Sequence, residues 1–166
     1  PVPELLALAR ERARPNTRFV EGDGTALPFP DRSFDLACTH RTLHHVGQPG
    51  RIVAELARVT RPGGRVLVAD QLAPDDPAAA ATLHEFETER DPSHTRLLTD
   101  GELRELFAAN RLSLLRGREE EERRELAAYL DLADCAGERR ARAEALARTD
   151  DRVLVASAGW YLLSAP

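Results

Sequence analysis

The sequence contains no lysine and no methionine, and it is poor in cysteine and in aromatic residues. All 23 basic residues are arginine, so a single arginine is weak evidence of function in this chain. Cys38 and Cys135 are too few and too far apart for a disulfide scaffold or a cysteine-based zinc site, and we expect reduced thiols in the cytoplasm. No apolar run approaches the roughly 20 residues that cross a bilayer. No basic region precedes an apolar stretch at the start, so we expect neither a membrane partner nor a secretion signal.

The charge balance also excludes a class of partner. The net charge of −5 and the pI near 5.6 leave no basic footprint for a nucleic-acid backbone, so nucleic-acid binding is not expected. With 166 residues, 42% of them apolar and 31% charged, the composition predicts one globular domain rather than two. The first residues, Pro1, Val2 and Pro3, and the lack of methionine suggest a fragment of a longer protein.

Helix and strand patterns alternate along the chain. Apolar residues at helical spacing predict helices over 4–14, 51–60, 75–90, 99–110 and 119–148. Short apolar or alternating runs predict strands over 18–21, 33–39, 65–70 and 112–116, with a final pair at 152–156 and 160–163. Thr99 and Glu102 have the spacing of a capping box, and Gly63 and Gly64 follow Pro62 at a helix stop. The pattern predicts an α/β fold with a mostly parallel sheet and a C-terminal antiparallel hairpin.

Three segments carry a family resemblance through their order and spacing. They are GDGTALPF at 22–29, DRSFDL at 31–36 running into RTLHHV at 41–46, and ELARVTRPGGRVLVAD at 55–70. Together they resemble the class I S-adenosylmethionine-dependent methyltransferases that act on small molecules, a group that includes the ubiquinone and menaquinone C-methyltransferases. The HTR run at 94–96 and the LTDGEL run at 98–103 resemble that family's substrate-side region. The resemblance implies a Rossmann-like sheet, S-adenosylmethionine as cofactor and a small-molecule methyl acceptor.

The first segment corresponds to the adenine side of the cofactor in the resembling family. There the carboxylate of Asp23 would accept the adenine amino group, backbone at Gly24 and Thr25 would frame the ring, and Leu27 would pack on it. The alternative for Asp23 is a turn residue that hydrogen-bonds its own backbone. Thr39 falls where the next strand ends, which implies a place beside the sulfonium.

Three histidines lie within six positions after that strand. His40 is a candidate for the sulfonium side, His40 and His44 are candidates for a general base, and His45 is a candidate for the substrate wall. Histidine is a common metal ligand, but no cysteine or carboxylate has a supporting spacing on this loop. We therefore expect a wall of the site, or packing beneath the loop, in preference to a metal.

We expect residues 1–166 to form a single, partial methyltransferase domain. Within it, the segment 75–99 follows the strand at 65–70, where the resembling family inserts a helical cap over the acceptor pocket. His84, Phe86, His94 and Arg96 are the candidate acceptor contacts in it. The alternative is that His84 and Phe86 only pack the cap helix.

The sequence departs from the family in one respect. It contains no D-x-G-x-G-x-G turn and no following ribose-binding acid, so we expect an N-terminally truncated, partial methyltransferase domain. The strand at 34–39 would then expose an apolar edge, and two copies of the chain could associate through it. The alternative function is a non-catalytic remnant or partner subunit. A nicotinamide-dependent dehydrogenase is disfavoured, since no G-x-G-x-x-G follows a strand.

Overall fold

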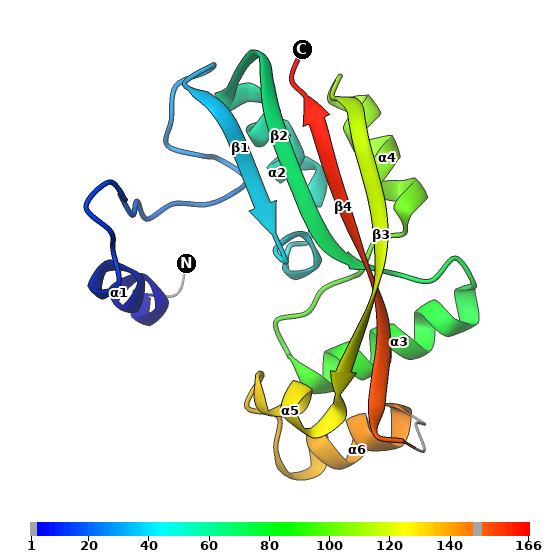
Figure 1. The fold of residues 1–166 in the computed structure, drawn as a ribbon. Helices are drawn as coiled ribbons and strands as arrows, with labels where there is room; N and C mark the ends of the chain where they lie inside the picture. Colours follow the sequence, from blue (N-terminus) through cyan, green and yellow to red (C-terminus); the bar gives the residue numbers. More distant parts are fainter. Residues whose placement is uncertain (1–2, 148–150) are drawn as a thin grey trace.

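The computed structural model describes residues 3–147 and 151–166. Its elements, in chain order, are α1 (Pro3–Glu11), β1 (Phe34–His40), the 3-10 helix η1 (Leu43–His45), α2 (Pro49–Val59), β2 (Thr60–Leu72), α3 (Pro77–Arg90), α4 (Asp100–Ala109), β3 (Ser113–Glu125), α5 (Leu126–Asp131), α6 (Gly137–Ala147) and β4 (Val153–Ser164). Figure 1 shows the described strands side by side in the order β1-β2-β4-β3. The α/β class is confirmed. One pairing, β1 with β2, is parallel, and β4 is antiparallel to both of its neighbours, so the sheet is mixed.

Two helices, α3 and α4, begin at side-chain caps that the sequence supplies. The carboxylate of Asp76 accepts the backbone N–H of Ala79 at 2.8 Å and starts α3. The predicted capping box starts α4, with Thr99 and Glu102 each bonding the other's backbone N–H. Close approach also requires the glycine at 64, because a Cβ there would lie 2.9 Å from the carbonyl oxygen of Asp35.

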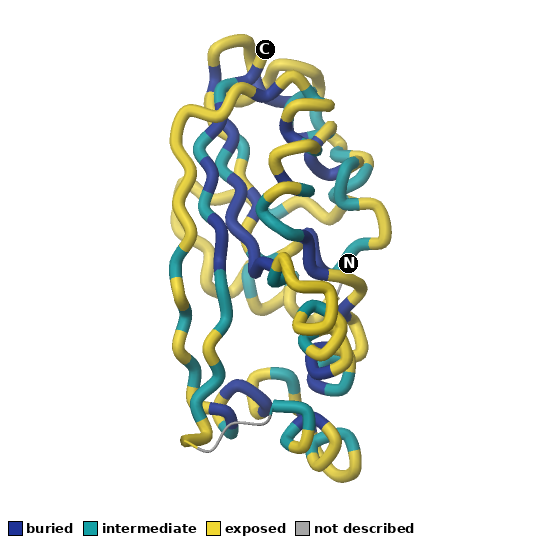
Figure 2. Tube along the Cα trace, turned by 90° about the vertical axis from the view of Figure 1, so that its right-hand side faces the viewer, coloured by how far each residue is buried: buried dark blue, intermediate teal, exposed yellow. Residues whose placement is uncertain are grey.

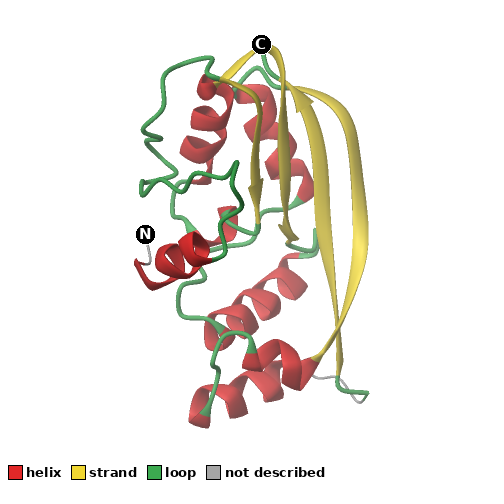
Figure 3. Ribbon diagram, turned by 60° about the vertical axis from the view of Figure 1, so that its left-hand side comes forward, coloured by secondary structure: helices red, strands yellow, loops and turns green. Residues whose placement is uncertain are grey.

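The main core lies between one face of the sheet and the helices α2 and α4. Val66 and Val68 of β2 and Leu163 of β4 pack there against Val53 of α2 and Phe107 of α4. Figure 3 shows the described helices on one side of the sheet. The side chains that alternate toward the other side, such as Leu36 and Cys38, are exposed. No described helix is long and apolar enough to cross a membrane.

A second, smaller core lies beyond the sheet. The antiparallel strands β3 and β4 are long and continue as a twisted two-stranded ribbon past the ends of β1 and β2 (Figures 1 and 2). The helices α3, α5 and α6 gather against that ribbon, and the buried residues of this core are Phe86, Leu126, Tyr129, Leu130, Cys135 and Ala143. Two packed units therefore meet at the carboxyl ends of β1 and β2.

Three predicted elements are wrong. Residues 18–21 form no strand in the described structure, because no neighbouring strand lies there to satisfy their backbone groups. The predicted helix over 119–148 is instead the end of β3 followed by α5 and α6, and Arg148 lies outside the described residues. The predicted strands at 152–156 and 160–163 are one continuous strand, β4.

The acidic and arginine run at 119–125 explains the second error. As a helix it would form ion pairs four residues apart, but it pairs with β4 and its charges meet at strand spacing, two residues apart. Arg118 lies 3.1 Å from Glu120, Arg123 lies 3.5 Å from Glu121, and Arg124 contacts Glu122. Charge patterning alone does not distinguish the two structures.

Candidate functional site

The carboxyl ends of the parallel strands β1 and β2 lie next to each other. His40 pairs with Ala69, and the backbone N–H of Arg41 donates to the carbonyl of Ala69 at 2.9 Å. Arg41 then adopts a left-handed backbone with φ of 50°, and the chain turns into η1. This turn brings the histidine loop beside Asp70, near the end of β2.

Asp70 is a buried carboxylate that organises this loop. It accepts the backbone N–H groups of Leu43 at 2.7 Å and of Gln71 at 2.8 Å, and it contacts Nδ1 of His44. Burial opposes ionisation, but the contact with His44 and the backbone hydrogen bonds from Gln71 and Leu43 together outweigh it and hold the pKa of Asp70 below its usual value. Because an ionised carboxylate only accepts, Nδ1 of His44 carries a proton, and Nε2 is the ring nitrogen that can act as an acceptor.

A second chain of hydrogen bonds orients His45. The hydroxyl of Ser93 donates to Asp91 at 2.6 Å, and its oxygen lies 2.9 Å from Nδ1 of His45. The serine has only one proton to give, so Nδ1–H of His45 is the donor in that contact. Both histidines of the loop therefore hold a proton on Nδ1 and leave Nε2 as a potential proton acceptor.

Glu87 of α3 is the centre of a buried network beside this loop. It accepts from Gln71 at 2.9 Å, from the hydroxyl of Tyr129 at 2.9 Å and from Nε of Arg90 at 2.7 Å. Burial disfavours the charge, but Arg90 overcomes that penalty and keeps the pKa of Glu87 below its usual value. Burial and the nearby Glu87 raise the pKa of Tyr129, so its hydroxyl stays protonated and donates. The network fixes α3 and α5 against the end of β2.

A cavity of about 410 Å³ opens where these groups meet. Its wall includes Gln71 and Leu132, together with the charged and aromatic side chains of Arg41, His44, His45, Arg90, Arg124 and Tyr129. The guanidinium groups of Arg90 and Arg124 lie 4.2 Å and 4.5 Å from the centre of the Tyr129 ring, as in cation–π contacts. The cavity thus combines two potential bases with cationic groups, and we identify it as the candidate site.

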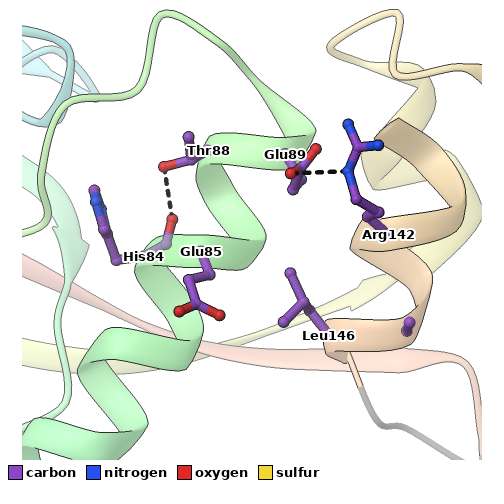
Figure 4. A pocket seen from close by; sticks show the side chains of 7 residues that line it. His84, Glu85, Thr88, Glu89, Arg142 and Leu146 are labelled. Atoms are coloured by element: carbon purple, nitrogen blue, oxygen red, sulfur yellow. Dashed lines mark hydrogen bonds and ion pairs between the residues drawn. The ribbon is translucent and has the colours of Figure 1, made fainter. Parts of the chain in front are cut away.

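A larger hollow, of about 500 Å³, lies between α3 and α6 (Figure 4). It is lined by exposed helix side chains, including His84 and Glu85, and the ion pair between Glu89 and Arg142, 3.0 Å long, bridges the two helices there. The buried network described above does not reach this hollow within the described residues. Its features fit helix packing better than a reaction site.

The structure places the predicted adenine-side residues in a loop anchored on α2. Asp23 accepts both the backbone N–H and the hydroxyl of Thr25 on its Oδ1, each at 2.8 Å, which is the turn that the alternative interpretation describes. These bonds, the backbone one first, lower the pKa of Asp23, so its carboxylate is charged. Gly24 lies against Ile52, and the backbone N–H of Leu27 donates to Glu55 at 2.6 Å.

Thr39 and His40 point to opposite faces of β1. Thr39 is buried toward the main core, whereas His40 is exposed on the open face, with its ring centre 5.5 Å from that of Trp160. His40 is not among the described residues that line the cavity, and His44 is. Of the two candidate bases, only His44 is therefore brought to the candidate site.

The four candidate acceptor contacts of the 75–99 segment have separate environments. Phe86 is 2% exposed and stacks on Tyr129 in the second core, as the packing alternative describes. Nδ1 of His84 lies 3.3 Å from Nε2 of His94. His94 is buried, and its Nδ1 has no partner among the described residues. Arg96 is exposed and paired with Glu102 at 2.9 Å.

Several site residues were not predicted, namely Asp70, Gln71, Glu87, Arg90, Arg124 and Tyr129. A signal existed for Asp70, since it is the one charged residue at the end of the apolar VLVAD run, where parallel strands place ligand-binding groups. Arg124 carried no such signal, because it sits in a run of charges and its position depends on β3 being a strand.

Comparison with known proteins shows similarity to methyltransferases. Residues 1–68 match the model of a methyltransferase domain. The chain is 37% identical over 107 residues to an uncharacterized methyltransferase of Bacillus subtilis, YcgJ, covering 64% of this chain and 42% of that protein. It is 47% identical over 60 residues to the demethylmenaquinone methyltransferase of Renibacterium salmoninarum, covering 36% of this chain and 25% of that enzyme. The crystal structure of YcgJ superposes with a TM-score of 0.86 at 24% identity, over 95% of this chain and 75% of that one.

These matches confirm the Rossmann-like fold of the class I S-adenosylmethionine-dependent methyltransferases. Residues 1–68 match the methyltransferase domain model, and over the matched 107 and 60 residues the chain is similar in sequence to methyltransferases. The chain spans less than half the length of the two curated relatives that it matches.

Proposed function

We propose that this chain provides the acceptor side of an S-adenosylmethionine-dependent methyltransferase that acts on a small molecule. The observation that carries the proposal is the Asp70–His44 pair, because Asp70 holds Nδ1 of a histidine that lines a cavity of about 410 Å³ at the carboxyl ends of two parallel strands. In open α/β sheets, ligands bind at that edge. The family match and the relation to a quinone methyltransferase support the same reaction class.

The described residues fit one end of the proposed cofactor. Asp23 is exposed and charged, and its loop is anchored on α2 through Glu55 and Arg58, so its carboxylate can accept an adenine amino group. Gly24, Thr25 and Leu27 adjoin it, and Thr39 and His40 are assigned to the sulfonium side. The sequence holds no D-x-G-x-G-x-G turn, so these residues account for the adenine end and not for the methionine end. When bound, S-adenosylmethionine supplies the methyl group and the positive sulfonium that activates it.

The chain's own task is to position the acceptor and remove its proton. Nε2 of His44 accepts the proton of the acceptor nucleophile, and Asp70 holds the ring in the required tautomer and stabilises the resulting imidazolium. The Glu87 network keeps Arg90 and Tyr129 in fixed places on the wall. Positioning of this kind accounts for much of the rate enhancement when the cofactor already carries an activated group.

Calorimetry with S-adenosylmethionine, together with transfer of labelled methyl to a panel of small hydroxyl- and amino-bearing acceptors, tests this function. We expect binding to be weak without a Gly-rich turn, and transfer to fall by roughly 10²–10⁴-fold in His44→Gln, the usual contribution of a general base. Arg61→Gln, at an exposed ion pair with Asp35 outside the cavity wall, is the control. A folded chain that neither binds the cofactor nor transfers methyl would favour the non-catalytic partner subunit.

A further inference from the structure

The wall of the candidate site has an uneven distribution of charge. Three arginines, Arg41, Arg90 and Arg124, line the cavity, and no carboxylate does so among the described residues. The carboxylates of this region lie behind the wall, where Glu87 holds Arg90, and Glu122 holds both Arg41 and Arg124. The wall of the cavity therefore includes three guanidinium groups, and the carboxylates that pair with them are not among its described lining residues.

Arg41 and Arg124 come from distant parts of the chain and converge on one carboxylate. Arg41 follows β1 and Arg124 is near the end of β3, and both contact the same oxygen, Oε2 of Glu122. Two guanidinium groups around one carboxylate oxygen form an arrangement that recognises carboxylates generally. Each guanidinium has five N–H donors, so both keep donors for a further oxygen on the cavity side.

The burial of Arg90 indicates that its position matters. Its side chain is only 9% exposed, and placing a guanidinium there costs solvation. An arginine that served solubility alone would not need this burial.

We propose that the cavity binds a small carboxylic acid, whose carboxylate lies between Arg41 and Arg124 and whose second, proton-bearing nucleophile faces Nε2 of His44. The identification of this acid as the methyl acceptor rests on the proposed function. The preference for a carboxylate does not, because it depends only on the cavity wall. Leu132, whose side chain is exposed on the cavity wall, provides apolar surface for the body of the acid.

Direct binding to the full chain tests the charge preference without cofactor. The probes are acetate, benzoate and 3-phenylpropanoate, each compared with its neutral primary amide by NMR titration. We expect at least one acid to bind at least 10-fold more tightly than its amide, and the difference to shrink as salt is added. Equal affinity within every pair, or no binding by any acid, overturns the proposal.

Two variants with opposite expected effects make the test specific. Arg41→Gln removes one guanidinium and should weaken the acid about 10-fold while leaving the amide unchanged. Glu122→Gln removes the competing internal carboxylate and should strengthen the acid several-fold. Arg61→Gln is the control, because Arg61 also forms a surface ion pair, with Asp35, at the opposite end of the β1–β2 pair. Equal effects of Arg41→Gln on acid and amide, or weaker acid binding in Glu122→Gln, overturn the proposal.

The outcomes also separate the two proposals. Acid selectivity without cofactor binding would contradict the methyltransferase function and keep the carboxylate site. Methyl transfer to neutral acceptors, with no preference for acids, would keep the function and overturn the carboxylate site.

Discussion

His44 and Asp70 are 26 residues apart in the chain and form a buried pair at the ends of two adjacent parallel strands. The pair exists because β1 and β2 stop at the same edge and because Asp70 also accepts two backbone N–H groups that fix its carboxylate. Its chemical consequence is that the Nδ1 proton of His44 is fixed, so Nε2 is the nitrogen that can accept a proton on a ring that lines the cavity.

Asp70→Asn tests this pair. The amide can donate to Nδ1 of His44, which would move the ring proton to Nε2 and remove the base from the cavity. We expect methyl transfer to fall by roughly 10²–10⁴-fold, the scale of a lost general base. The free energy of unfolding should fall by about 1–3 kcal/mol, since a charge-assisted hydrogen bond is weakened.

The control is the double variant. If His44 and Asp70 act as one unit, His44→Gln combined with Asp70→Asn should be no slower than either single variant. Multiplying losses, or an unchanged pH–rate profile in Asp70→Asn, would show that Asp70 has only a structural role.

His94 predicts a pH dependence of stability. Burial, with smaller contributions from the neighbouring His44, His84 and His45, outweighs the opposing charge of Glu87 and lowers the pKa of His94 to about 4. His94 therefore binds a proton less readily in the folded chain than in the unfolded chain, where its pKa is near 6.5. We expect the free energy of unfolding to be unaffected by His94 above pH 6.5 and to fall by up to about 3 kcal/mol as the pH drops toward 4.

Urea denaturation between pH 7.5 and 5 measures this slope. The window avoids the carboxylates Asp70 and Glu87, whose lowered pKa values keep them charged throughout it. His94→Gln should flatten the slope, whereas His84→Gln, at an exposed position, should leave most of it. A wild-type slope that survives in His94→Gln would assign the dependence to another group.

The parts of the fold that local patterns encode were predictable. The strand over 33–39, the helix over 51–60 and the capping box at Thr99 carry apolar spacing or cap residues within a few positions of each other. The run at 119–125 was misread, because alternating glutamate and arginine fits a helix or a strand equally well. Pairing with β4, more than 30 residues later, decides between them.

The candidate site also has parts that local sequence predicts and parts that depend on distant residues. The histidine loop was recognisable from its motif, but which histidine faces the cavity depends on η1 and on Asp70, and neither is encoded in the loop itself. Tyr129 and Arg124 lay in a segment that was predicted as one helix, so their approach to Gln71 could not be anticipated. The positions of Tyr129 and Arg124 follow from the pairing of β3 with β4, which are distant in the sequence.

Tyr129→Phe tests the network around Glu87. The variant removes a hydroxyl that donates to Glu87 at 2.9 Å, and it leaves a buried carboxylate with one donor fewer. We expect a loss of about 1–2 kcal/mol in the free energy of unfolding, measured in urea. Tyr161→Phe is the matched comparison, because its hydroxyl donates at 2.6 Å to Asp100, which is partly exposed and can be solvated instead. Equal losses in both variants would argue against a special role for the Glu87 network.

Asp23→Ala tests the adenine side of the proposed cofactor site. The variant removes the turn around Thr25 and the carboxylate that would accept the adenine amino group. In a complete version of the domain, we expect the affinity for S-adenosylmethionine to fall, because a hydrogen bond to a charged group is lost, as measured by calorimetry. Asp31→Ala, which removes an exposed carboxylate paired with Arg58, should leave that affinity within experimental error.

The last prediction concerns the open edge of β1. Among the described residues, β1 pairs only with β2, so its other edge presents unpaired backbone groups together with the exposed side chains of Phe34 and Leu36. We expect the chain to associate as its concentration rises, which sedimentation velocity over a dilution series would detect.

Leu36→Lys places a charge at this edge and should reduce the association while changing the free energy of unfolding by no more than about 0.5 kcal/mol. Val155→Lys is the control, because Val155 is similarly exposed but lies on the ribbon of β3 and β4, where β4 pairs with β3, away from the edge of β1. A monodisperse monomer at every concentration, or an equal effect of the two lysines, would show that the edge of β1 does not drive association.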